Sequence, residues 1–167
     1  MVRRFEPVMQ ILNEAGVRYL VVGGVAVVLH GYLRTTDDLD LVIDLENDNV
    51  RRAVEALDAA GFRPRAPVSI RDFANPELRR LWVETKNMQV FSLWHERLPG
   101  FEVDLFVEAP FDFGGAWERR VEIHLEDTTA AVVSRDDLLK LKRAAGRPRD
   151  LDDLQALEEP ATGDGDE

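Results

Sequence analysis

The sequence predicts an α/β fold, with helices flanking a mixed central sheet and a helical segment near the C-terminal end. Short β-branched, apolar runs typical of buried strands alternate with stretches whose apolar residues recur at helical spacing. The 167 residues suit one domain with a sizeable core, and 45% hydrophobic content is typical of a globular protein. We place this domain at residues 4–157 and expect the acidic tail, residues 158–167, to be disordered.

The expected elements follow one another closely. A helix ends at Gly16, because its apolar residues have helical spacing and glycine then stops it. After two strands, Asn47 or Asp48 is the expected cap of a helix that closes at Gly61. The remaining expected elements are a strand at 62–65, a helix at 75–85 capped by Asn75, strands at 88–94, 101–107, 121–125 and 130–133, a helix that begins at Ser134, and a short helix after Pro148.

The stretch at residues 21–44, VVGGVAVVLHGYLRTTDDLDLVID, organises the chain. Its first apolar run stops at Gly23 and Gly24, and such a pair lets the backbone turn sharply and approach a ligand with free N–H groups. Arg34 precedes an acidic cluster, where a guanidinium either solvates a loop or holds phosphate; we favour phosphate. Thr36 lies beside it in the same turn. The stretch therefore predicts a phosphate cradle.

Two carboxylates follow this cradle. On a strand, Asp38 and Asp40 project from one face, and together they would repel each other unless a divalent cation intervened. Magnesium takes oxygen ligands, usually one or two carboxylates with phosphate and water. The best third carboxylate is Asp104 in FEVDLFVE, although Glu102 shares its face. The alternative for the pair is a solvated acidic strand end. An EF-hand is excluded, because no glycine stands at the sixth position.

The order GG, RxTxDxD and a later VDL resembles the nucleotidyltransferase superfamily. A closer likeness is to small prokaryotic proteins related to the abortive-infection AbiEii toxins, which also share a C-terminal segment like LLKLKRAAGRPRDLDDL. The likeness spans residues 4–157. It implies a nucleotidyltransferase fold and transfer of a nucleoside monophosphate from a nucleoside triphosphate to a hydroxyl. One or two Mg²⁺ ions would be held by Asp38, Asp40 and Asp104, with phosphate contacts from Gly23, Gly24, Arg34 and Thr36.

Lys142 is the notable residue of the C-terminal segment. On a helix it lies beside an apolar stripe of Leu138, Leu141 and Ala145, so that its ammonium group reaches a cleft or extends to solvent. The resemblance implies that Lys142 is a catalytic residue acting with a later aspartate. Asp150 and Asp153 both match, and the sequence leaves the choice open.

The resemblance also implies partners. The acceptor would be the 3′ end of an RNA such as tRNA, or a protein side-chain hydroxyl, and a cognate antitoxin would restrain a toxin. Two alternatives stay open: a non-catalytic nucleotide-binding or regulatory module of the same fold, and a small-molecule nucleotidyltransferase that modifies antibiotics. The presence of all three acids argues against the first.

Charge, cysteine content and hydropathy restrict the possible partners and cellular location of the protein. The net charge of -11 disfavours nucleic acid, but residues after 149 include acids and no Lys or Arg, so the body is nearly balanced and a local basic groove remains compatible with it. Cysteine is absent, which suits a reducing cytoplasm. No apolar run approaches the ~20 residues of a membrane span, and the N-terminus lacks a secretion signal. We therefore expect a cytoplasmic protein without a membrane partner.

Overall fold

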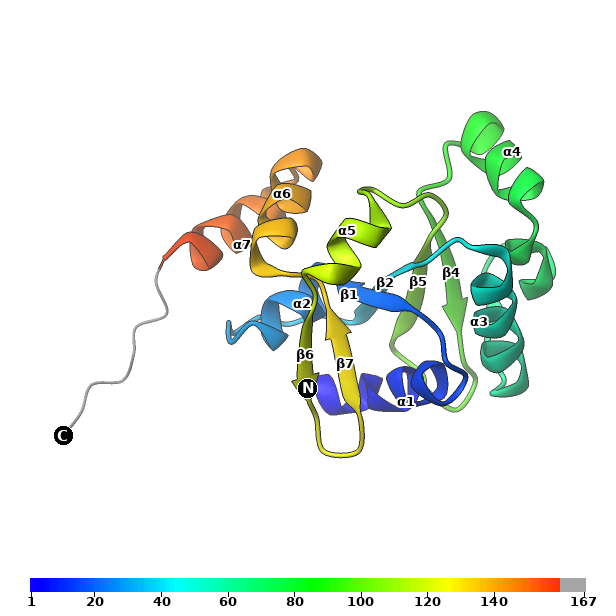
Figure 1. The fold of residues 1–167 in the computed structure, drawn as a ribbon, viewed down its shortest axis with the longest axis horizontal. Coiled ribbons are helices and arrows are strands. Elements are labelled where there is room, and N and C mark those ends of the chain that lie inside the picture. The colour runs from blue at the N-terminus through cyan, green and yellow to red at the C-terminus, as the bar shows by residue number, and fades with distance from the viewer. Residues whose placement is uncertain (160–167) are drawn as a thin grey trace.

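A seven-stranded mixed sheet runs through the protein in the order β3-β4-β5-β2-β1-β7-β6 (Figure 1). The computed structural model describes residues 1–159, and residues 160–167 of the expected disordered tail lie outside this part. The strands are β1 Tyr19–Val22, β2 Asp38–Ile43, β3 Arg63–Pro64, β4 Val90–Trp94, β5 Glu102–Phe106, β6 Val121–His124 and β7 Thr129–Val132. The predicted α/β class with a mixed sheet is confirmed.

Helices lie before, between and after the strands along the chain and flank the sheet. Their bounds are η1 Val2–Phe5, α1 Glu6–Glu14, α2 Gly23–Leu29, α3 Asn47–Ala59, η2 Ile70–Ala74, α4 Pro76–Lys86, α5 Phe113–Glu118, α6 Arg135–Ala145 and α7 Pro148–Glu158. Asn75 and Ser134 cap α4 and α6 as the sequence predicts, because each side chain accepts hydrogen bonds from backbone N–H groups of the first turn. Glu158, the first residue of the expected tail, instead ends α7. Within residues 1–159, no helix has the length and apolar composition needed to cross a bilayer.

The centre of the sheet consists of β1, β2 and β5. Strand β2 pairs antiparallel with β1 and parallel with β5. Leu39, Leu41 and Leu105 are fully buried and share one core with apolar residues of α1 and α3. Because side chains alternate along a strand, the intervening residues of β2 and β5 project from the opposite face. That face carries the predicted carboxylates.

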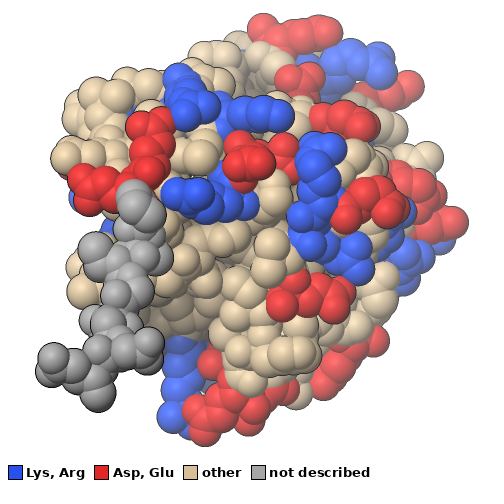
Figure 2. Space-filling view, turned by 60° about the vertical axis from the view of Figure 1, so that its left-hand side comes forward, with Lys and Arg blue, Asp and Glu red and all other residues tan. Residues whose placement is uncertain are grey.

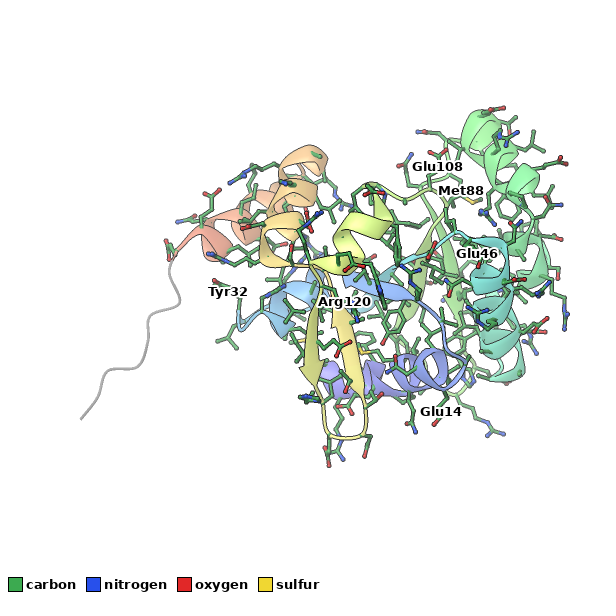
Figure 3. All side chains as sticks on the ribbon, viewed as in Figure 1. Glu14, Tyr32, Glu46, Met88, Glu108 and Arg120 are labelled. Atoms are coloured by element: carbon green, nitrogen blue, oxygen red, sulfur yellow. The ribbon has the colours of Figure 1, made fainter. Side chains whose placement is uncertain are left out.

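Three local expectations differ from the structure. The cap of α3 is Glu46 rather than Asn47 or Asp48, since its carboxylate accepts from the backbone N–H groups of Asp48 and Asn49. Figure 3 labels Glu46 beside the start of α3. On α6 the buried stripe includes Leu139 and Lys142, whereas Ala145 is exposed, because α7 packs against this helix. The short helices η2 and α5 were not predicted. The sequence features that indicate these helices are a capping box at Ser69 for η2 and the capping carboxylate of Asp112 for α5.

Candidate active site

The turn after β1 is shaped by two glycines that other side chains approach closely. Gly23 has φ +66, and a Cβ atom there would stand 2.1 Å from Oδ2 of Asp40. A Cβ atom on Gly24 would stand 2.9 Å from both Nη1 of Arg34 and Oγ1 of Thr36. Only glycine fits these positions without displacing the neighbouring groups. The turn therefore brings together all four residues predicted to form the phosphate cradle and one predicted acid.

Strand pairing brings the three predicted acids into one region. In the parallel register of β2 and β5, Asp40 stands opposite Asp104 and Asp38 stands opposite Glu102. All three aspartates line a cavity of about 580 Å³, together with the glycine pair, Arg34, Thr36 and Lys142. Glu102 does not line this cavity. The register thus distinguishes Asp104 from its neighbour of the same parity.

Burial, followed by repulsion from neighbouring acids, raises the pKa of Asp38, Asp40 and Asp104. Burial is the largest cause at Asp40 and, with repulsion from Asp104 and then Asp38, raises the pKa of Asp40 to about 6. Burial also raises the pKa of Asp104, and the facing Ser92 hydroxyl partly opposes this shift. At Asp38, burial is followed by repulsion from Glu102 as a cause of a raised pKa. Ionising the whole group is therefore unfavourable unless positive charge is supplied.

The donor set suits a hard cation that keeps other oxygen ligands. Oδ1 of Asp104 is buried and has no hydrogen-bond partner within the described residues. Over residues 1–159, no group of three or more His, Cys, Asp or Glu side chains is arranged to hold a metal ion by itself. Magnesium is commonly bound by only one or two carboxylates, with water and substrate phosphates completing its octahedron. The adjoining Asp40 and Asp104 carboxylates fit that mode.

A buried ionic network connects the C-terminal helices to the glycine turn. Nζ of Lys142 lies 3.1 Å from Asp150 and 2.8 Å from Asp153, and Nη1 of Arg34 lies 2.7 Å from Asp153. Nε of Arg147 contacts Asp150 at 3.0 Å. Both aspartates that the sequence left open therefore contact Lys142. Asp150 lines the cavity, whereas Asp153 does not line it and instead contacts both Arg34 and Lys142.

The same network sets the ionisation of Asp150. Burial would raise the pKa of this carboxyl, but hydrogen bonds from Arg147 and Lys142 outweigh burial and hold it below its ordinary value. Asp150 consequently stays ionised and keeps Lys142 oriented. Lys142 is buried and paired here, so it does not extend to solvent.

Two further cations line the cavity beyond the predicted site residues. Arg147 and Arg149 follow Gly146, which ends α6 in a left-handed conformation. The Arg-Pro-Arg sequence after this glycine is the feature from which these two site residues could have been predicted, because a tight helix connection keeps both arginines close to the preceding helix. On the face shown in Figure 2, basic and acidic side chains are interspersed rather than gathered in one basic surface. Within the cavity, the four basic residues Arg34, Lys142, Arg147 and Arg149 lie among five aspartates.

The protein combines a mixed sheet with a glycine turn after β1 and with acids on the paired strands β2 and β5. This combination is typical of the nucleotidyltransferase class. The model of the family described as "Nucleotidyltransferase of unknown function (DUF6036)" matches residues 4–158, and the chain belongs to this family. No curated protein matches the sequence.

Two solved structures share the fold. Lincomycin-bound LnuA, a lincosamide antibiotic adenylyltransferase, is 16% identical with a TM-score of 0.64, over 95% of this chain and 97% of that chain. An antigenic nucleotidyltransferase-like protein from Paracoccidioides brasiliensis is 17% identical with a TM-score of 0.56, over 89% and 70% of the respective chains. These matches do not extend to the AbiEii toxins that the motifs resemble.

Proposed function

We propose that the protein is a metal-dependent enzyme that transfers a nucleoside monophosphate from a nucleoside triphosphate to a hydroxyl acceptor. The observation that carries this proposal is the pairing of Asp40 with Asp104 beside the Gly23 turn, in a chain of a nucleotidyltransferase family. The acceptor oxygen forms a bond to the α-phosphorus. The bond from that phosphorus to the bridging oxygen breaks, and pyrophosphate leaves with the electron pair.

The glycine turn and its cations are proposed to bind the triphosphate. Gly23 and Gly24 have no side chain of their own, so they offer backbone N–H groups close to Arg34, Thr36 and Asp40. Arg34 and Lys142 offset the charge that develops on the departing pyrophosphate. Asp153 holds these two cations in fixed positions, which limits the reorganisation required during the reaction.

The carboxylates are proposed to serve both metal and acceptor. Asp38 and Asp40 would hold one or two magnesium ions, and Asp104 would complete the site nearest the acceptor. When bound, magnesium supplies Lewis-acid stabilisation of the phosphate charge. Asp104 accepts the proton of the acceptor hydroxyl, directly or through a water molecule. Burial raises the pKa of Asp104, which makes this carboxylate a stronger base than an ordinary exposed aspartate.

The proposed functions differ in the chemical class of the acceptor. LnuA is a lincosamide antibiotic adenylyltransferase that aligns over almost the full length of both chains, which supports a small-molecule acceptor. The 3′ end of tRNA, a protein hydroxyl and a cognate antitoxin follow only from the AbiEii resemblance. The non-catalytic module is opposed by the three acids, all of which line one cavity.

Two measurements test the activity. Incubation of each labelled triphosphate and Mg²⁺ with total RNA, total protein, aminoglycosides and lincosamides identifies any labelled acceptor, with Asp40→Asn as the control. Thermal shifts with each triphosphate, with and without Mg²⁺, measure binding separately. Magnesium-dependent stabilisation that persists in both Asp38→Asn and Asp40→Asn would refute the metal assignment. Binding without transfer to any acceptor would favour the non-catalytic module.

A further inference from the structure

The acids of the candidate site stand between two adjoining cavities. Beside the polar cavity lies a second cavity of about 590 Å³, and Asp40, Asp104 and Lys142 line both. Arg34 and Thr36 line only the first. The second cavity therefore reaches the reacting carboxylates. It shares Gly23 and Lys142 with the first cavity, but Gly24, Arg34 and Thr36 do not line it.

The residues that line only the second cavity carry no charge. Most of them are apolar and come from α6 on one side and from β4 and β5 on the other: Leu138, Leu141 and Ala144, with Val90 and Phe106. Leu141, Val90 and Phe106 are only partly buried, so their apolar surface remains available to a ligand. The cavity thus presents an uncharged wall opposite the carboxylates.

Phosphate groups are poorly matched to this cavity. Its two cations, Lys142 and Arg147, are shared with the first cavity, whereas Arg34 and Arg149 line only the first. Asp40 and Asp104 add negative charge at the same wall. A phosphodiester would lose its hydration there beside acids and apolar groups, which is unfavourable. An uncharged ligand meets no such penalty.

We infer that the second cavity is the acceptor subsite, and that the acceptor is a compact, uncharged molecule with an apolar or aromatic body and a hydroxyl group that reaches Asp104. This inference rests on the proposed function and specifies its substrate class. The volume lies within the range typical of small-molecule pockets. The apolar body contacts Leu141 and Phe106, while the triphosphate occupies the cavity beside Arg34.

The test compares two leucines under the same substitution. Leu141→Gln makes the cavity wall polar while preserving side-chain length and helix propensity. Leu151→Gln is the matched control, because Leu151 is an exposed leucine of α7 that lines neither cavity. Probes are a set of neutral aryl glycosides, kanamycin as a polycation, and total tRNA as a polyanion. Each is assayed for label transfer from the four triphosphates and titrated by calorimetry.

The expected acceptor or ligand is an aryl glycoside. Its dissociation constant or KM should rise about tenfold or more in Leu141→Gln and stay within about twofold in Leu151→Gln, with triphosphate affinity unchanged in both. Label transferred to tRNA or kanamycin instead, or no glycoside binding, would overturn the inference. So would an equal loss of triphosphate affinity in Leu141→Gln, which would assign the cavity to the nucleoside.

Two controls separate the possible failures. Absence of both triphosphate binding and label transfer refutes the proposed function, whereas Asp40-dependent labelling of tRNA retains that function and refutes only the acceptor class. Glycoside binding that depends on Leu141 supports the subsite even without turnover. If Leu141→Gln does not fold, Ala144→Glu is used in its place, and Ala144→Gln is the uncharged control. Ala144 lines the same wall but is exposed, so substitutions there should not prevent folding.

Discussion

Asp40 on β2 stands directly opposite Asp104 on β5 in the parallel register at the centre of the sheet. Burial, together with the charge of Asp104 and then of Asp38, raises the pKa of Asp40 to about 6. The pair is therefore a site where either a proton or a cation relieves repulsion. The repulsion between these carboxylates has a measurable effect on the free energy of unfolding.

Asp40→Asn should change how stability depends on pH. The ordinary pKa of the carboxyl is 3.8 and its folded value is about 6, so the unfolded chain releases the proton first as pH rises. The wild-type free energy of unfolding should therefore fall between pH ~4 and ~6, whereas the variant should lack this decrease. Near pH 7.5 the variant should be more stable, by at most about 3 kcal/mol. Urea denaturation from pH 4 to pH 8 measures this; parallel profiles would contradict it.

Gly23→Ala should disrupt the site more than an equivalent change elsewhere. Gly16 has nearly the same backbone angle, φ +68 against +66, but a Cβ atom there meets nothing within 4 Å. Gly16→Ala should therefore cost about 1–2 kcal/mol through conformation alone. Gly23→Ala should cost more, because its Cβ atom also displaces the Asp40 carboxylate. Thermal unfolding and ATP titration measure both effects, and equal losses in the two variants would show that the close approach is unimportant.

Lys142→Met should be strongly destabilising. It removes the cation that contacts Asp150 and Asp153, whose carboxylates are almost fully buried. Removing one partner of a buried ion pair typically costs about 3–5 kcal/mol. Lys140→Met, on the exposed side of the same helix, should stay within about 0.5 kcal/mol of wild type. Guanidinium denaturation compares them; a small effect at position 142 would mean that the network relaxes or admits water.

Arg34→Gln should weaken binding of a triphosphate more than binding of the monophosphate. Its guanidinium lines the cavity and is oriented by Asp153, so it is placed to contact the terminal phosphates. We expect an increase of about tenfold in the dissociation constant for ATP and little change for AMP, as for a single charge-assisted contact. Arg80→Gln, at an exposed position of α4, is the control. Equal losses for ATP and AMP would place Arg34 elsewhere on the nucleotide.

The sequence by itself determined the features that depend on local geometry. The strand at Tyr19–Val22, the glycine stop after it and the caps at Asn75 and Ser134 follow from periodicity and backbone preference, which act over a few residues. Alternation also placed Asp38 and Asp40 on one face of a strand without knowledge of the fold. These predictions were reliable because no distant segment is needed to satisfy them.

The tertiary structure alone decided which distant groups meet. Asp104 and Glu102 have the same parity on β5, and only the register with β2 sets Asp104 against Asp40. Lys142 is buried because α7 brings Asp150 and Asp153 against it, an arrangement that helical spacing on α6 does not specify. The uncharged cavity likewise forms only where α6 faces β4 and β5. Pairing register and helix packing are set by contacts between segments far apart in the chain, which a local pattern does not encode.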